Sequence, residues 1–352
     1  MASKTLVRRT MKIIRTLAIL GLVLGLSAAA QAQGSDPLLL NGAGATFPYP
    51  IYSKWFEEYR KLHPTVQINY QSVGSGAGIQ QLQAGTVDFG ASDGPMSDDQ
   101  LTNAKVKVLH FPTVLGAALP SYNLPGVNAE LNFTPEALAG IFLGKIRKWN
   151  DPAISGANPK VSLPAKDIVV IHRSDGSGTT YIWTDYLAKV SEEWKTRVGK
   201  GTSVNWPAGL GAKGNEGVAG LVKQTPYSFG YIELIYAIQN RISYGKVRNA
   251  AGTFVKADLA SVSAAAAGAA KSMPEDFRVS ITNPPGKTAY PISSFTWLLI
   301  PEHIADGNKR EALKGFLRWM LTDGQKYCEG LSYARLPQEV VDKEMKAIAR
   351  IQ

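Results

Sequence analysis

The chain has 352 residues, with 38 basic and 28 acidic side chains and a formal net charge of +10. The first 32 residues carry five of the basic side chains and no acidic one, so the remainder has a surplus of only five. That surplus weakly favours anionic ligands, and without a recognisable basic helix bearing an aromatic platform it does not indicate nucleic-acid binding. The single cysteine, Cys328, excludes an internal disulfide, and we expect a packed core residue there rather than a nucleophile.

The N-terminus has the pattern of an export signal. Basic residues from Lys4 to Arg15 precede an apolar run from Leu17 to Leu26, and Ala30-Gln31-Ala32 fits the small-residue cleavage pattern. The apolar run is shorter than the roughly 20 residues of a transmembrane helix. We therefore expect cleavage after Ala32 and a soluble mature protein, without a lipid because no cysteine lies near the cleavage site.

Strand-like and helix-like segments alternate along the rest of the chain, which predicts an α/β protein with largely parallel sheets. Extended segments are expected at 38–40, 66–70, 87–91, 106–109, 114–119 and 168–172. Helices are expected at 51–62, with a first turn from Pro48, and at 78–83, 135–144, 179–190, 260–271, 309–321 and 338–348.

Two apolar extended segments, 114–122 and 290–300, are candidate crossings between two domains. About 320 mature residues suffice for two domains of ordinary size. We therefore expect domain I to comprise residues 33–116 and 292–352, with domain II, residues 117–291, inserted between them.

Three segments rich in glycine and hydroxyl residues join a strand to a helix. They are Asn41-Gly-Ala-Gly-Ala-Thr-Phe-Pro48, Gly74-Ser-Gly-Ala-Gly78 and Asp175-Gly-Ser-Gly-Thr-Thr180. Unpaired N–H groups at a helix start attract anions. Because ligands of open α/β sheets bind at strand ends, the three starts suggest one oxyanion held from several sides.

Individual residues at these junctions also have simpler interpretations. Thr46 and Phe47 could donate to an anion through N–H groups and the Thr46 hydroxyl, or Thr46 could merely cap its helix, and Ser75 has the same two interpretations. Arg173 ends a predicted strand and offers a fork of donors to an oxyanion, with Asp175 able to hold the fork. The alternative for this pair is a surface ion pair beside a capped helix.

Asp93 follows a predicted strand and precedes Gly94-Pro95, so its local sequence is typical of a turn residue. An acid beside an anion site is repulsive unless the anion has a proton to share. Hydrogen phosphate has such a proton and sulfate at neutral pH does not, so a carboxylate facing the ligand would select phosphate by repelling sulfate.

Together these motifs resemble the periplasmic phosphate-binding proteins of bacterial phosphate ABC importers. Further matching runs are Leu143-Gly-Lys-Ile-Arg-Lys-Trp-Asn150, Trp206-Pro-Ala-Gly-Leu-Gly-Ala-Lys-Gly-Asn215 and Gly230-Tyr-Ile-Glu233, in order within residues 40–340. The resemblance implies a two-domain periplasmic-binding-protein fold of type II, with two hinge segments and no enzymatic activity, cofactor or metal. It implies phosphate contacts from Thr46, Phe47, Ser75, Asp93, Arg173, Ser177, Gly178 and Thr179, with Asp175 bracing Arg173.

The resemblance also implies a periplasmic monomer that delivers inorganic phosphate to an inner-membrane ABC permease with a cytoplasmic ATPase. One departure is Gly76-Ala77, where relatives often have Ser-Gly, so the geometry of this loop is open.

Two other functions compete: binding of another oxyanion, such as sulfate or molybdate, and an exported phosphatase. Asp93 argues against the first, and the second lacks a recognisable metal cluster or nucleophile–base pair. Gly209-Leu-Gly-Ala-Lys-Gly214 satisfies G-x-G-x-x-G but follows Trp206-Pro207 instead of a strand, so a dinucleotide site is not expected. The four histidines lack metal-ligand spacing.

Overall fold

The computed structural model describes residues 37–352, so the expected signal segment and its cleavage site after Ala32 lie outside the described residues. Leu39–Gln352 forms one compact unit. None of the helices in this part of the chain is long and apolar enough to cross a membrane.

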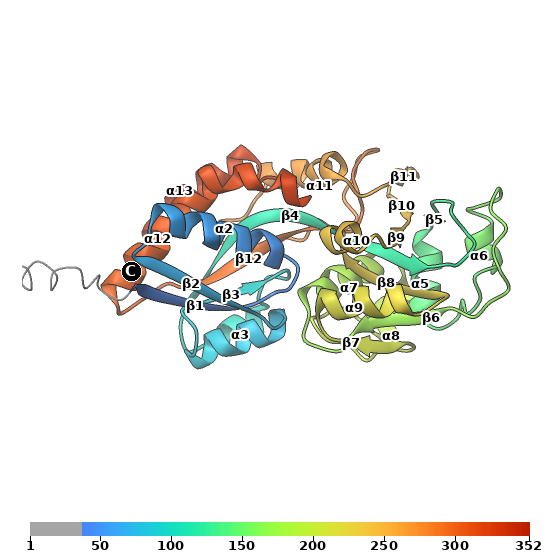
Figure 1. Cartoon of the computed structure of the whole chain (residues 1–352), viewed down its shortest axis with the longest axis horizontal. Helices are drawn as coiled ribbons and strands as arrows, with labels where there is room; N and C mark the ends of the chain where they lie inside the picture. The colour runs from blue at the N-terminus through green and yellow to red at the C-terminus, as the bar shows by residue number, and fades with distance from the viewer. Residues whose placement is uncertain (1–36) are drawn as a thin grey trace, which may run out of the picture. The chain divides into compact units, whose positions relative to one another are not determined.

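The main sheet has nine strands in the order β2-β1-β3-β12-β4-β8-β6-β7, with β9 paired to β4 (Figure 1). Parallel pairs join β1 to β3 and β6 to both β7 and β8, whereas β12 and β4 pair with their neighbours antiparallel. The expected α/β class is confirmed, but the sheet is mixed rather than largely parallel, because β4 and β12 pair antiparallel with each other and with β8 and β3. The strands are β1 (Leu38–Gly44), β2 (Val66–Ser72), β3 (Phe89–Ser92), β4 (Val108–Asn123), β6 (Val169–Arg173), β7 (Leu210–Ala212), β8 (Ser228–Glu233), β9 (Ser243–Tyr244) and β12 (Ser293–Pro301).

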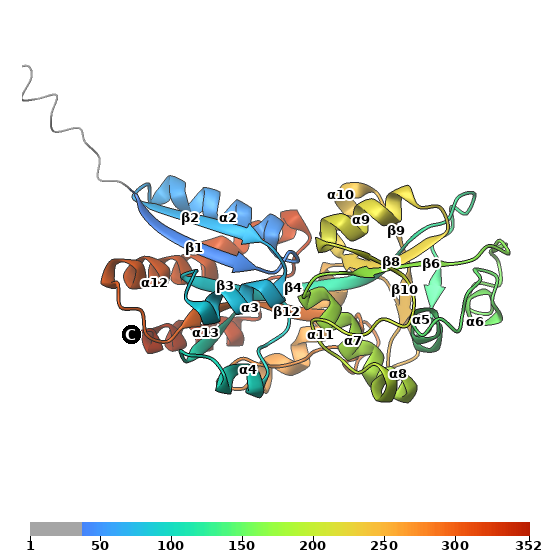
Figure 2. The ribbon, with the colours of Figure 1, turned by 90° about the horizontal axis from the view of Figure 1, so that it is seen from below.

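Strand β4 lies in the middle of the strand order and joins the two halves of this sheet. Its first part pairs with β12, and its last part, from Ala118 to Asn123, pairs with β8 (Figure 2). The sequence predicted two separate extended segments here, at 106–109 and 114–119, but the strand is continuous and buried in all but its last residue. Pro112 interrupts the sequence pattern, and the pairing with β12 shifts register close to it, between Thr296 and Trp297.

Helices cover the sheet and follow many of its strands. The expected helices are confirmed, with shifts of up to three residues at their starts: α2 (Tyr49–Leu62), α3 (Ser75–Ala84), α5 (Pro135–Phe142), α7 (Gly178–Val190), α11 (Leu259–Lys271), α12 (Gly307–Leu321) and α13 (Gln338–Ala347). Helices that the sequence analysis did not predict are α4 (Asp98–Thr102), α6 (Pro152–Ser155), α8 (Glu192–Arg197), α9 (Gly214–Gln224) and α10 (Leu234–Asn240), with 3₁₀ turns η1 (Asp323–Tyr327), η2 (Glu329–Leu331) and η3 (Ile348–Arg350). A small second sheet joins β5 (Asn132–Phe133), β10 (Lys246–Arg248) and β11 (Phe254–Val255).

Buried aromatic side chains fix the helix that follows β1. Tyr52 and Trp55 of α2 are fully buried, and the ring of Tyr52 meets that of Tyr70 edge-on at 5.5 Å. The Trp55 indole donates to the carbonyl of Gly324 at 2.7 Å. Burying such side chains stabilises a fold by about 1.5–3 kcal/mol each, so the start of α2 is held firmly.

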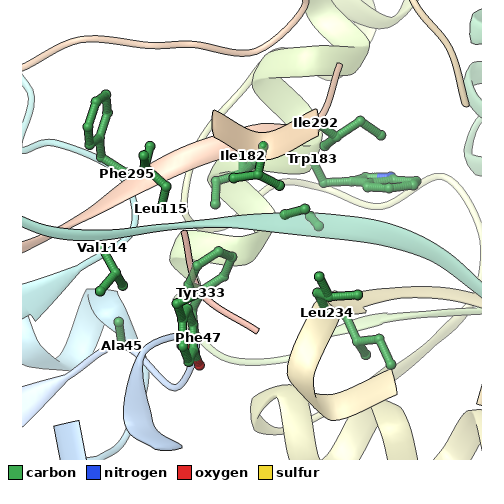
Figure 3. Packing of buried hydrophobic residues seen from close by; sticks show 14 of the residues in the cluster. Ala45, Phe47, Val114, Leu115, Ile182, Trp183, Leu234, Ile292, Phe295 and Tyr333 are labelled. Atoms are coloured by element: carbon green, nitrogen blue, oxygen red, sulfur yellow. The ribbon is translucent and has the colours of Figure 1, made fainter. Parts of the chain in front are cut away.

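The core continues under the first glycine-rich junction. Phe47 packs against Tyr333, with ring centroids 6.5 Å apart, and Val114 and Leu115 of β4 lie close by (Figure 3). Cys328 is buried, as expected, and burial raises the pKa of its thiol to about 12.

Candidate functional site

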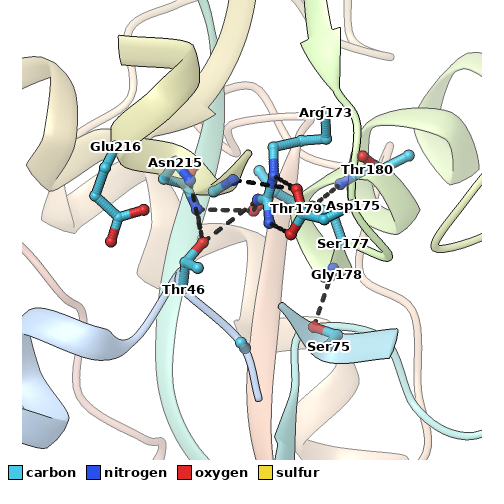
Figure 4. Close-up of polar contacts among 12 residues, drawn as sticks. Thr46, Ser75, Arg173, Asp175, Ser177, Gly178, Thr179, Thr180, Asn215 and Glu216 are labelled. Carbon is cyan, nitrogen blue, oxygen red and sulfur yellow. Dashed lines mark hydrogen bonds and ion pairs between the residues drawn. The ribbon is translucent and has the colours of Figure 1, made fainter. Parts of the chain in front are cut away.

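Four helix starts contribute to one buried polar cluster (Figure 4). Helices α2, α3, α7 and α9 follow β1, β2, β6 and β7, respectively. The first N–H groups of each helix have no acceptor within the helix and carry partial positive charge. The sequence predicted three of these starts, and the fourth, α9, begins at Gly214 within the glycine-rich run that follows Trp206.

The turn after β1 depends on a close backbone approach. Gly44 has φ +148°, and a Cβ built on it would lie 2.1 Å from the carbonyl oxygen of Ala91. Only glycine fits such a position. The chain therefore turns directly after β1, and Thr46 and Phe47 precede Pro48, the N-cap of α2.

Thr46 faces the cluster rather than its own helix. Its hydroxyl accepts hydrogen bonds from Asn215 Nδ2 at 2.8 Å and from Arg173 Nη1 at 3.4 Å. The N-cap of α2 is Pro48, and the helix has no side-chain cap bond. The simpler interpretation of Thr46 as a helix cap is therefore wrong. Phe47 buries its ring in the core, and its carbonyl accepts from the Tyr333 hydroxyl at 2.6 Å.

Ser75 is the first residue of α3 and joins two other predicted site residues. Its Oγ accepts from the N–H of Gly178 at 3.0 Å and from that of Asp93 at 3.3 Å. No side chain caps α3, so the capping interpretation fails here as well.

Gly76, next to Ser75, is where the sequence departs from the family pattern. In the structure it contacts a second glycine, Gly176. The N–H of Gly76 donates to the carbonyl of Gly176 at 2.9 Å. A Cβ built on either glycine would lie 3.0 Å from the Cα of the other. The loop before α7 and the start of α3 are thus in backbone contact.

Arg173 and Asp175 form a buried two-pronged ion pair. Arg173 Nε donates to Asp175 Oδ1 at 2.7 Å and Nη2 donates to Oδ2 at 2.5 Å. The side chains are 1% and 13% exposed, so the alternative of a surface ion pair is wrong. Burial disfavours the charged Asp175, but hydrogen bonds and charge from Arg173, together with the N–H of Gly214, outweigh it and lower the pKa of Asp175. Nη1 remains directed at Thr46 and Thr179, at 3.4 and 3.5 Å.

The start of α7 supplies the remaining predicted donors. Ser177 is the N-cap, and its hydroxyl accepts from the N–H of Thr180 at 3.1 Å, so this serine does cap its helix. Its O–H proton stays available as a donor. Gly178 and Thr179 are buried in the first turn.

Asp93 packs against this helix start instead of facing solvent. The residue is 1% exposed, and a Cβ built on Gly178 would lie 2.5 Å from Asp93 Oδ2. The other carboxylate oxygen, Oδ1, accepts from the Thr296 hydroxyl at 2.8 Å. Burial raises the pKa of Asp93 to about 7, against the opposing effects of the Thr296 hydrogen bond and the Arg173 charge. Asp93 is thus a buried acid among hydrogen-bond donors.

The sequence analysis did not identify Asn215 or Thr296 as part of this cluster. Asn215 is the second residue of α9, is 1% exposed, and contacts Thr46 and Thr179. A polar amide directly after the glycine that opens a helix was the available signal. Thr296 lies on β12, far from every glycine-rich junction, and only the strand pairing reveals it.

Two other sequence patterns have a structural outcome. The G-x-G-x-x-G run contains β7 and opens α9, so its glycines serve this cluster of helix starts. Within residues 37–352, no three histidine, cysteine, aspartate or glutamate side chains are grouped so that they could hold a metal ion.

Comparisons with known proteins agree with this architecture. The PBP superfamily domain matches residues 27–324. The phosphate-binding protein PstS of Pasteurella multocida is 47% identical over 305 residues, which cover 86% of this chain and 88% of that protein.

Two solved structures share the fold. One is a high-affinity periplasmic phosphate-binding protein, PfluDING, bound with phosphate, with a TM-score of 0.69 and 22% identity over 88% of this chain and 93% of that one. The other is an ABC-type phosphate transport receptor from Vibrio cholerae, with a TM-score of 0.53 and 19% identity over 85% of this chain and all of that one.

Proposed function

Because the chain belongs to the PstS family of phosphate-binding proteins, we propose that it binds inorganic phosphate at the cluster of helix starts and delivers it to an ABC transporter for import. The family consists of substrate-binding proteins, so the alternative of an exported phosphatase is set aside.

The observation that carries the choice of anion is the buried carboxylate of Asp93 beside the start of α7. Every other predicted contact is a hydrogen-bond donor, whereas an ionised carboxylate only accepts. Hydrogen phosphate can donate its proton to Asp93. Sulfate has no proton to give at neutral pH and would be repelled by the ionised carboxylate of Asp93. This contrast supports phosphate over sulfate.

We assign the donors from the polar hydrogens at the helix starts; one of them, the N–H of Gly178, donates to Ser75 Oγ and would be shared with the anion. Ser75 illustrates the argument: its oxygen already accepts from two N–H groups, so its own proton is free to donate. Asp175 takes the Nε proton and one Nη2 proton of Arg173, which leaves the second Nη2 proton and one Nη1 proton for the anion. The proposed donors are Thr46, Phe47, Ser75, Arg173, Ser177, Gly178 and Thr179, with Asp93 as the acceptor.

We also propose that the chain works as two domains that close on the ligand. Domain I comprises residues 33–116 and 292–352, domain II comprises residues 117–291, and β4 and β12 cross between them. The contacts of Thr46 with Arg173 and of Ser75 with Gly178 join the two proposed domains. An anion bound to both would favour the closed form.

The expected setting follows from the N-terminal signal pattern and the family. We propose that residues 1–32 are removed and that a monomer without a lipid acts in the periplasm. The closed form would dock on an inner-membrane permease whose ATPase is cytoplasmic.

Equilibrium titration with labelled phosphate, with sulfate as competitor, tests the ligand. We expect saturable binding of phosphate that a large excess of sulfate does not displace. Equal competition by sulfate would favour a general oxyanion binder and contradict the role given to Asp93.

A further inference from the structure

Asn215 lies between two hydroxyl groups of the cluster. Its Nδ2 donates to Thr46 Oγ1 at 2.8 Å and to Thr179 Oγ1 at 3.1 Å. Its Oδ1 accepts from the N–H of Glu233 at 3.0 Å, which identifies the acceptor side of the amide. Both amide protons are therefore used on the two threonines. With 1% of Asn215 exposed, water does not compete for these bonds.

The Thr46 hydroxyl is surrounded by donors. Besides Asn215 Nδ2, the main-chain N–H of Asn215 lies 3.2 Å from Thr46 Oγ1, and Arg173 Nη1 lies 3.4 Å from it. A hydroxyl oxygen has two lone pairs, so these donors occupy its capacity to accept. Its proton must then point to a different acceptor. Thr179 Oγ1 likewise has two donors, Asn215 Nδ2 at 3.1 Å and Arg173 Nη1 at 3.5 Å.

We propose that Asn215 is a positioning residue that fixes the Thr46 and Thr179 hydroxyls as donors toward the bound anion. This inference rests on the proposed function, phosphate binding at this cluster. A free hydroxyl can either accept from or donate to an anion oxygen, whereas a hydroxyl with occupied lone pairs can only donate. Two fixed donors select unprotonated anion oxygens, and the single proton of hydrogen phosphate is left for Asp93.

A double-mutant cycle with Thr179 tests this role. Asn215→Ala removes the amide donor, and Thr179→Val removes the hydroxyl while keeping the side-chain shape. We expect Asn215→Ala to weaken phosphate binding by about ten- to a hundredfold, the range for losing one or two hydrogen bonds to a charged ligand. The double variant should lose clearly less than the product of the two single effects, because Asn215 acts through the hydroxyl that Thr179→Val removes.

Thr179 separates this role from a simple tie between the two proposed domains. Thr46 and Asn215 lie in different proposed domains, so a tie alone would couple these two residues. Thr179 and Asn215 both lie in proposed domain II, so coupling between them supports orientation of the hydroxyl. Additive effects of Asn215→Ala and Thr179→Val would overturn the proposal.

Two further variants keep the test independent of folding. Asn158 is a buried asparagine whose Nδ2 donates to two carbonyl oxygens and whose Oδ1 accepts from the N–H of Asn132, away from the cluster. Asn158→Ala should lower the melting temperature and leave phosphate affinity unchanged. Asn215→Asp keeps the acceptor for the Glu233 N–H, but its carboxylate would attract the threonine protons. It should weaken binding at least as much as Asn215→Ala.

Wild-type affinity in either Asn215 variant would also overturn the inference. Wild-type protein that fails to bind phosphate in the same titration would instead overturn the proposed function. The two failures are thus distinguishable within one set of measurements.

Discussion

Replacing Asp93 by asparagine should collapse the discrimination between phosphate and sulfate. The substitution keeps the size of the side chain, and the amide oxygen can still accept from the Thr296 hydroxyl. It removes the only acidic side chain among the proposed ligand contacts. Phosphate loses a charge-assisted acceptor, and sulfate loses a repulsive partner.

The expected change in the ratio of phosphate to sulfate affinity follows from the burial of Asp93, which is 1% exposed. A hydrogen bond to a charged group contributes about 1.5–3 kcal/mol, and this is the expected loss for phosphate. Two like charges about 4 Å apart repel by about 4 kcal/mol at an effective dielectric constant of about 20, which is a ceiling on the gain for sulfate. Since about 1.4 kcal/mol is a factor of ten, the ratio of the two affinities should fall at least tenfold.

Isothermal titration of both anions into wild type and Asp93→Asn at pH 8.5 and one ionic strength measures this ratio. The pH is set above the pKa of Asp93, which burial raises to about 7, so that the wild-type carboxylate is ionised. Asp185→Asn is the matched control, because Asp185 is also 1% exposed. It lies on α7 but is not one of the proposed ligand contacts. An unchanged ratio in Asp93→Asn would refute the reasoning that Asp93 detects the proton of the ligand.

Four further measurements follow from the same structure. Lowering the pH from 8.5 to 5.5 protonates Asp93 and lets it donate, so sulfate should compete better with phosphate in wild type but not in Asp93→Asn. Arg173→Lys keeps the charge and loses the fork held by Asp175, so phosphate binding should weaken by roughly 1.5–3 kcal/mol in titration. Glu344 is fully buried, neither carboxylate oxygen has a partner among the described residues, and burial raises its pKa well above the usual value. Because the folded state then binds the proton more tightly, wild-type stability falls as pH rises above the unfolded pKa, and Glu344→Met should raise the free energy of unfolding by about 1–3 kcal/mol, more at pH 8 than at pH 5. Mass spectrometry of exported protein should give an N-terminus at Gln33, either free or cyclised, and no lipid.

Each of these measurements has an outcome that would contradict the reasoning. Equal competition by sulfate at pH 8.5 and pH 5.5 in wild type would mean that protonation of Asp93 does not set the discrimination. Unchanged affinity in Arg173→Lys would remove Arg173 from the proposed contacts. Equal pH dependence of unfolding in wild type and Glu344→Met would mean that Glu344 does not carry the linkage. An intact 1–32 segment on exported protein would contradict the signal interpretation.

Local sequence was sufficient for three of the four helix starts that contribute to the cluster, and it missed the start of α9. Glycine and hydroxyl residues between an apolar run and an amphipathic run predict a strand–turn–helix junction. Thr46, Ser75 and Thr179 were identified as candidates from this pattern. What local sequence could not give was burial. Asp93 looks like a turn residue, and Arg173 with Asp175 looks like a surface pair, until distant elements cover them.

Long-range pairing explains the rest of the difference. Thr296 meets Asp93 only because β12 pairs with β3, and the continuous β4 emerges only from its two sets of partners. Glu344 occupies the buried face of α13, where helical periodicity would predict an apolar residue. Such exceptions depend on tertiary contacts, which no window of sequence contains.

The contact between Gly76 and Gly176 leaves little room for a side chain at either residue. One methyl group on either residue would sit 3.0 Å from the opposite Cα, which is tighter than nine in ten such contacts, so one of the two segments would have to move by a few tenths of an ångström. In a separated arrangement of the two proposed domains, neither position would meet any such limit. A single alanine there would therefore act as a wedge: it would leave the separated form untouched while shifting the population away from the form that holds the anion.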